Sequence, residues 1–65
     1  MEIKFAENLS LLRKGKDLSQ KQLAERVGVD QRTVSTWERG ICEPNYETLS
    51  KLCEILNETF DGILT

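Results

Sequence analysis

The segment that decides the fold is Gln20–Gly40, which reads QKQLAERVGVDQRTVSTWERG. Its apolar residues, counted from Gln20, occupy positions 4, 8, 10, 15 and 18: Leu23, Val27, Val29, Val34 and Trp37. Intervals of three and four residues place side chains on one face of a helix. Ala24 is small enough for two helices to cross closely, and Gly28 can open a tight turn with positive φ. The pattern therefore predicts two short helices that are joined by a turn and packed on a third.

Capping side chains mark where these two helices begin and end. Ser19 and Gln22 have the spacing of a capping box at the start of the first helix, which Gly28 ends. Asp30 is suited to be the N-cap of the second helix, which closes at Gly40. The two-helix core is therefore expected to span roughly residues 19–40.

Apolar periodicity outside this core predicts three more helices. The first carries the stripe Phe5, Leu9 and Leu12 and ends near Gly15, a residue suited to a left-handed position after a helix. The other two follow the expected N-caps Asn45 and Thr59, and their inward residues are Leu49, Leu52, Cys53, Leu56, Phe60, Ile63 and Leu64. We expect an all-α fold of five helices that forms one domain over residues 1–65.

Length and composition exclude several classes of function. The chain has 65 residues and no apolar run near the roughly 20 needed to cross a bilayer, so we expect a cytoplasmic protein that does not enter a membrane. It has no histidine and only two cysteines, which leaves it without the commonest general base and without the ligands of a zinc site. We therefore expect no enzymatic activity, no metal and no other cofactor.

Charge is distributed unevenly along the chain. The formal net charge is −2, yet residues 13–39 hold seven basic and only four acidic side chains. From residue 41 onward there are five acidic side chains and a single basic one, Lys51. Such asymmetry predicts that one face of the protein meets a polyanion while the other stays away from it.

The core and its flanking residues resemble the lambda-repressor-like helix-turn-helix family, the XRE family, to which phage repressors and Cro proteins belong. The resemblance extends from Phe5 to Leu64 and rests on Ser19-Gln20, Leu23-Ala24, Gly28-Val29, Trp37-Glu38-Arg39-Gly40, Pro44 and the Leu49, Leu52 and Leu56 stripe. It implies a transcriptional regulator that binds double-stranded DNA, and it favours a repressor. It also implies that the helix after Asp30 lies in the major groove. No site for a small-molecule effector is evident.

The exposed face of the helix after Asp30 supplies the candidate base contacts. With Val34, Trp37 and Ile41 expected to point inward, its outward side chains are Gln31, Arg32, Ser35, Thr36 and Arg39. Glutamine can bond adenine, arginine can bond guanine, and the methyl group of threonine can contact thymine. The resemblance implies that Gln31, Arg32 and Thr36 are the main base contacts, and Ser35 is a further candidate.

Four polar residues are candidates for phosphate contacts: Gln20, Lys21, Arg39 and Asn45. Gln20 follows the N-cap of a helix, where free N–H groups and the helix dipole favour an anion. The resemblance implies that Gln20 binds phosphate. It also implies that Arg13 and Glu38 form a partly buried ion pair, which orients the DNA-reading helix.

A single copy of so small a domain, with few basic residues, is expected to bind DNA weakly. We therefore expect a homodimer on a palindromic operator, with Ile55 and Leu64 as candidate interface residues. An alternative is a protein-interaction module, for example an antitoxin-type adaptor, built on the same fold. The polar face from Gln31 to Thr36 favours DNA binding, because such a module would carry acidic or bulky residues there.

Overall fold

The computed structural model describes residues 4–65, which form five helices and no strand. They are α1 (Phe5–Gly15), α2 (Gln20–Val27), α3 (Gln31–Glu38), α4 (Tyr46–Leu56) and α5 (Phe60–Leu64). The expected all-α class with five helices is therefore confirmed. The expected domain starts at residue 1, and its first three residues lie outside the described part. None of the helices in residues 4–65 is long and apolar enough to cross a membrane.

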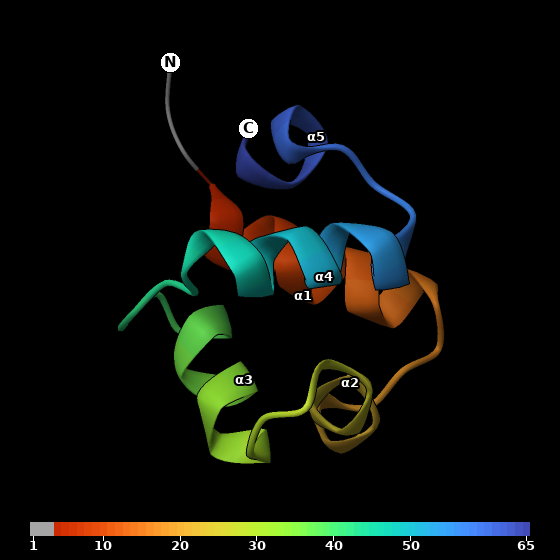
Figure 1. The fold of residues 1–65 in the computed structure, drawn as a ribbon, viewed down its shortest axis with the longest axis vertical. Coiled ribbons are helices and arrows are strands. Elements are labelled where there is room, and N and C mark those ends of the chain that lie inside the picture. The colour runs from red at the N-terminus through yellow and green to blue at the C-terminus, as the bar shows by residue number, and fades with distance from the viewer. Residues whose placement is uncertain (1–3) are drawn as a thin grey trace.

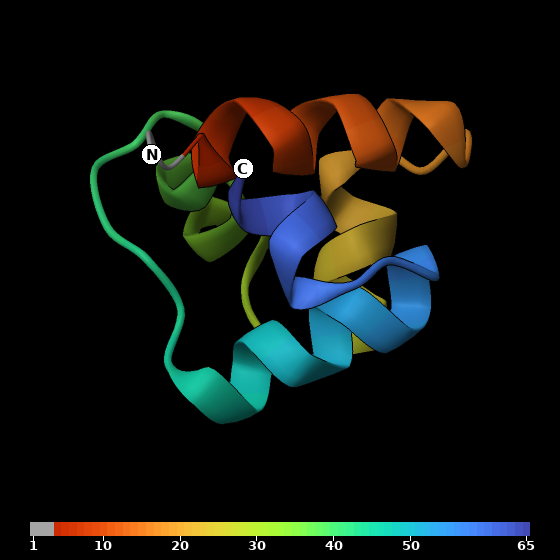
Figure 2. The ribbon, with the colours of Figure 1, turned by 90° about the horizontal axis from the view of Figure 1, so that it is seen from above.

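α1 and α4 overlap in the view of Figure 1, but the view from above shows that they lie apart, on opposite sides of the core (Figure 2). α2 and α3 lie on one side of this pair, and α5 lies on the other. Seen from above, α5 occupies the space between α1 and α4 (Figure 2). α2 packs on α3 and α4, while α1 packs on α3 and α5. The two ends of the described chain meet, because the Lys4 N–H donates to the Leu64 carbonyl at 2.7 Å.

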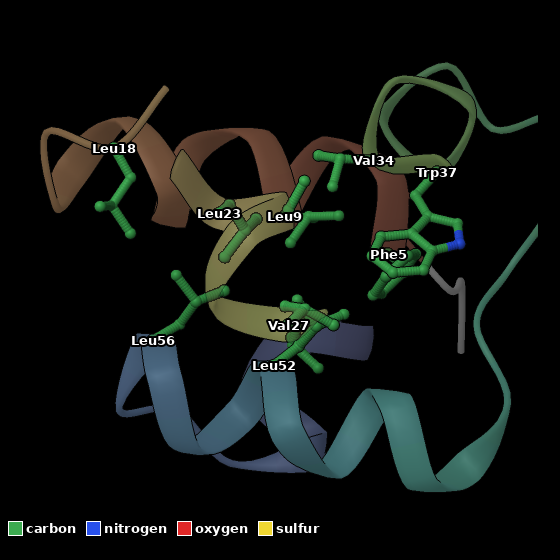
Figure 3. Close-up of a cluster of buried hydrophobic side chains, with 11 residues drawn as sticks. Phe5, Leu9, Leu18, Leu23, Val27, Val34, Trp37, Leu52 and Leu56 are labelled. Carbon is green, nitrogen blue, oxygen red and sulfur yellow. The ribbon is translucent and has the colours of Figure 1, made fainter. Parts of the chain in front are cut away.

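Every helix contributes one side chain with no exposed surface to a single core: Leu9, Leu23, Val34, Leu52 and Ile63. These five side chains belong to the predicted apolar stripes of their helices. Figure 3 shows that the labelled side chains from four of the helices point toward a common centre. The loop between α1 and α2 adds Leu18, which was not predicted from the helical periodicity because it lies outside a helix.

Side-chain caps define the helix starts that the sequence predicts. The Gln22 N–H donates to Ser19 Oγ at 3.0 Å, and the Ser19 N–H donates to Gln22 Oε1 at 2.8 Å, which completes the capping box. Asp30, Asn45 and Thr59 each accept a backbone N–H from the first turn of their helices. These bonds satisfy donors that have no partner inside the helix, so they fix where each helix begins.

Two predictions about helix ends are wrong. Gly15 is the last residue of α1, and the left-handed residue that follows is Asp17 at φ 57°. Ile41, expected to point inward, is 63% exposed. The reason is that Gly40 adopts φ 74° and the Ile41 N–H bonds to the Thr36 carbonyl, which ends the helix and turns the chain away. Ile41 is therefore outside the helical register that would have placed it in the core.

Candidate nucleic-acid interface

The outward face of α3 is polar and lies beside the start of α2. Val34 and Trp37 anchor the opposite face of α3 in the core, while Gln31 and Arg32 are exposed and Ser35 is half-buried. A groove of about 610 Å³ runs between the two helices. It is lined by Gln20, Lys21, Ala24, Glu25, Asp30, Gln31, Arg32 and Ser35. Five of the eight predicted DNA contacts are thus brought together in one groove.

The other three predicted contacts lie outside this groove. Thr36 is half-buried, and its hydroxyl donates to the Thr33 carbonyl at 2.7 Å and lies 3.2 Å from Cys42 Sγ. Arg39 is exposed, with its Nε 3.4 Å from the Ser35 carbonyl. Asn45 is exposed at the start of α4, where Oδ1 accepts the Thr48 N–H and leaves the amide nitrogen available.

The predicted ion pair between Arg13 and Glu38 is present and joins α1 to α3. Arg13 Nε donates to Glu38 Oε2 at 2.6 Å, and Arg13 Nη2 donates to Glu38 Oε1 at 3.0 Å. The two side chains are only 11% and 7% exposed. Arg13 Nη1 also donates to the Leu18 carbonyl at 2.7 Å, so the guanidinium is held on three sides.

A third residue shares this carboxylate. Gln20 Nε2 donates to Glu38 Oε1 at 3.1 Å, which connects the start of α2 to the same pair. Burial raises the pKa of the Glu38 carboxyl, but the hydrogen bonds from Arg13 and Gln20 and the attraction to Arg13 and Lys14 outweigh it, so the pKa lies below the ordinary 4.5. The hydrogen bond with Glu38 is the main reason that the pKa of Arg13 is raised. Both groups are therefore charged at neutral pH.

The groove holds side chains of both signs. Lys21 and Arg32 are basic, whereas Glu25 and Asp30 are acidic. Glu25 was not among the predicted site residues, although it follows Lys21 by four residues and therefore shares its face of α2. Since a carboxylate repels phosphate, we expect the groove to contribute more to reading bases than to sequence-independent attraction.

The described residues contain no group of three side chains suited to hold a metal ion. The two candidate dimer residues, Ile55 and Leu64, are half-buried against the core of the single chain. Leu64 lines a small cavity of about 200 Å³ at the junction of α1, α4 and α5. Phe60 is also half-buried and packs against the exposed Tyr46 ring, with 5.4 Å between ring centroids.

A polar helix that is anchored on one face and laid across a second helix is the arrangement with which helix-turn-helix domains enter the major groove. The helix-turn-helix family model HTH_3 matches residues 9–63. The HTH-type transcriptional activator BcrR of Enterococcus faecalis is 40% identical over 63 residues, which are 97% of this chain and 31% of that protein. A transcriptional regulator from Listeria innocua has a crystal structure that is 34% identical, with a TM-score of 0.91, over 98% of this chain and 60% of that one. The chain therefore belongs to the helix-turn-helix family, of the Cro/C1 type, and the relatives named above are transcriptional regulators.

The same fold also occurs inside an enzyme. Hydroxypropylphosphonic acid epoxidase from S. wedmorenis is 26% identical, with a TM-score of 0.87, over 94% of this chain and 32% of that one. The chain spans less than two thirds of the length of each of these three proteins. Because a fold alone does not determine an activity, the function of this chain has to be argued from its own groove.

Proposed function

We propose that this protein binds double-stranded DNA sequence-specifically by placing α3 in the major groove. The observation that carries the proposal is the groove between α2 and α3, where Gln31, Arg32 and Ser35 lie beside Gln20 and Lys21. Arginine and glutamine can each make two hydrogen bonds to a base edge, and these contacts distinguish one base pair from another. Their exposed positions on a helix anchored by Val34 and Trp37 support this role.

Phosphate contacts at the start of α2 fix the register of α3 on the duplex. The capping box occupies the N–H groups of Ser19 and Gln22, which leaves those of Gln20 and Lys21 for an anion. Arg39 and the amide nitrogen of Asn45 supply further contacts on the other side of α3. With its hydroxyl bonded to Thr33, Thr36 contacts a thymine methyl group.

The proposed role in the cell is that of a cytoplasmic repressor. Occupying an operator is enough to block access to the DNA, whereas activation requires an additional surface that recruits another protein. The protein binds as a homodimer on a palindrome, because two linked copies gain affinity through effective concentration. Ile55 and Leu64 remain the proposed interface residues. DNA binding of this kind uses no metal or cofactor and no catalytic group.

Selection of bound duplexes from a random DNA pool tests this proposal with the wild-type protein and with Arg32→Ala. The wild type is expected to enrich one sequence. Arg32→Ala is expected to lose about 1–3 kcal/mol of discrimination at a single base pair while the rest of the preference is kept. Arg26→Ala is the matched control, because Arg26 is an exposed arginine on α2 that does not line the groove. An unchanged preference with Arg32→Ala would contradict the placement of α3.

A further inference from the structure

The side chain of Gln20 is held in place before any DNA is bound. It is half-buried, and its Nε2 donates one hydrogen bond to Glu38 Oε1 at 3.1 Å. A glutamine amide nitrogen carries two hydrogens, so one remains for another acceptor. Glu38 is itself fixed by two bonds from Arg13 and is only 7% exposed in its side chain. The acceptor that holds Gln20 is therefore a rigid one.

We propose that Glu38, fixed by Arg13, is a positioning residue that aims the Gln20 amide at a DNA phosphate. This inference rests on the proposed function, since it requires that Gln20 meet a phosphate. A free glutamine side chain loses conformational entropy when it is fixed. The hydrogen bond to Glu38 already fixes the Gln20 side chain before DNA is bound, so little of this entropy is lost on binding. The same bond leaves the second N–H of Gln20 for the phosphate.

Arg13 makes this arrangement compatible with a phosphate nearby. An unpaired carboxylate next to the phosphate site would repel the DNA. Two hydrogen bonds from the guanidinium neutralise Glu38, and the low exposure of both side chains keeps water from screening that pairing. Arg13, Gln20 and Glu38 come from α1, α2 and α3, so the phosphate contact is joined to the helix that reads the bases.

The effect on DNA affinity of removing the Arg13–Glu38 pair depends on whether the pair only stabilises the fold or also positions Gln20. If the pair only stabilises the fold, removing it leaves the DNA affinity of the folded protein unchanged. If the pair acts through Gln20, its removal weakens binding, and it has no further effect once Gln20 is gone. In that case DNA affinity depends on an acceptor oxygen at position 38 that binds Gln20, and a neutral amide oxygen serves as well as a carboxylate.

The test compares two variants that both lack the ion pair and leave the net charge unchanged relative to the wild type. Arg13→Met/Glu38→Leu removes the acceptor for Gln20, whereas Arg13→Met/Glu38→Gln keeps an acceptor oxygen. Neither leaves an orphan buried charge, so both are expected to fold, which far-UV circular dichroism verifies. Two further variants complete a mutant cycle: Gln20→Ala alone, and the triple variant Arg13→Met/Gln20→Ala/Glu38→Leu. The probe is a random-sequence duplex of about 20 base pairs, because phosphate contacts do not depend on sequence.

Gln20→Ala and Arg13→Met/Glu38→Leu are each expected to weaken binding about tenfold, and the triple variant no further. Arg13→Met/Glu38→Gln is expected to bind nearly as well as the wild type. Because Gln20 is neutral, the slope of log affinity against log salt stays unchanged in all of these variants, whereas Lys21→Ala lowers its magnitude by about 0.9.

Two results would overturn the inference while leaving DNA binding intact. One is wild-type affinity in Arg13→Met/Glu38→Leu when Gln20→Ala is weakened. The other is a triple variant whose loss is the product of the separate losses, because the pair would then act independently of Gln20. Failure of the wild type to bind the duplex would instead refute the proposed function, together with everything that rests on it.

Discussion

At the scale of single residues, the Arg13–Glu38 pair is a buried ion pair with two hydrogen bonds between its side chains. It lies at the meeting of α1 and α3 with side chains that are 11% and 7% exposed. A buried pair of this kind contributes little over an apolar replacement, but the loss of one partner leaves a charge buried alone. The pair therefore acts mainly to specify how α3 sits on α1, and it makes the fold sensitive to anything that removes one charge.

Acid is one such condition. The pKa of Glu38 is lower in the folded protein than its ordinary value of 4.5, so the folded state binds a proton less readily than the unfolded state. The stabilisation is complete above the unfolded pKa and is lost as the pH falls below about 4.5 through the folded value. Thermal melting at pH 7 and at about pH 3 measures the loss, with Arg13→Met/Glu38→Leu as the control for the other carboxylates. An equal drop in melting temperature in both proteins would mean that Glu38 does not contribute.

At the scale of helices, the turn between α2 and α3 depends on one backbone conformation. Gly28 has φ 89°, and the N–H groups of Gly28 and Val29 both bond to the Ala24 carbonyl. A Cβ added at Gly28 would meet no atom within 4 Å, so only the backbone conformation opposes a side chain there. Gly15 also has open space, but it lies at the end of α1 without a positive φ.

The two glycines therefore predict opposite effects of the same substitution. Gly28→Ala is expected to destabilise the protein by about 1 kcal/mol, because alanine is strained at positive φ. Gly15→Ala is expected to stabilise it by up to about 1 kcal/mol, because alanine loses less backbone entropy in a helix. Urea unfolding followed by circular dichroism measures both. Equal shifts of the two midpoints in one direction would contradict this assignment of the turn.

At this scale, the sequence predicts correctly the features that depend on residues close together along the chain. Ser19 and Asp30 cap their helices as predicted because a cap bonds to an N–H two or three residues away. Ile41 was misplaced because its position depends on how the chain leaves α3 at Gly40, which apolar spacing does not encode. The contact of Arg13 with Glu38 spans 25 residues and was accessible only through the family resemblance.

The groove could be predicted only in part, because some of its features depend on spacing along one helix and others on how two helices approach each other. Gln31 and Arg32 follow from the helical register once Val34 and Trp37 are inward. The bond from Gln20 to Glu38 depends on how closely α2 and α3 approach each other, and spacing along one helix gives no information about that distance. It was therefore found only in the structure.

At the scale of the whole molecule, residues 13–39 carry a positive net charge and the residues after 41 carry a negative one. The acidic excess after residue 41 lies on α4, α5 and the loops that flank them, whereas the groove lies between α2 and α3. A duplex held in the groove is then flanked by the less acidic part of the protein. A chain of 7.5 kDa with a groove of mixed charge is expected to gain affinity for DNA by forming a homodimer.

A homodimer predicts a definite number of protein chains on each DNA duplex. Sedimentation of the protein at micromolar concentration with its selected duplex is expected to give two chains per duplex, on half-sites about 34 Å apart. Gel mobility of duplexes with one half-site deleted provides the control, and binding to these is expected to be much weaker. One chain per duplex, on a sequence without two-fold symmetry, would rule out the dimer.

The most direct test of DNA binding through the α2–α3 groove is to map backbone amide chemical shifts by NMR. The protein is titrated with a random-sequence duplex of about 20 base pairs at low salt, where sequence-independent binding is strongest. The largest changes are expected at Gln20, Lys21, Gln31 and Arg32, with little change along α4 after its first turn and along α5. Shifts concentrated on α4 and α5, with the groove unaffected, would contradict the assignment of the DNA-binding face.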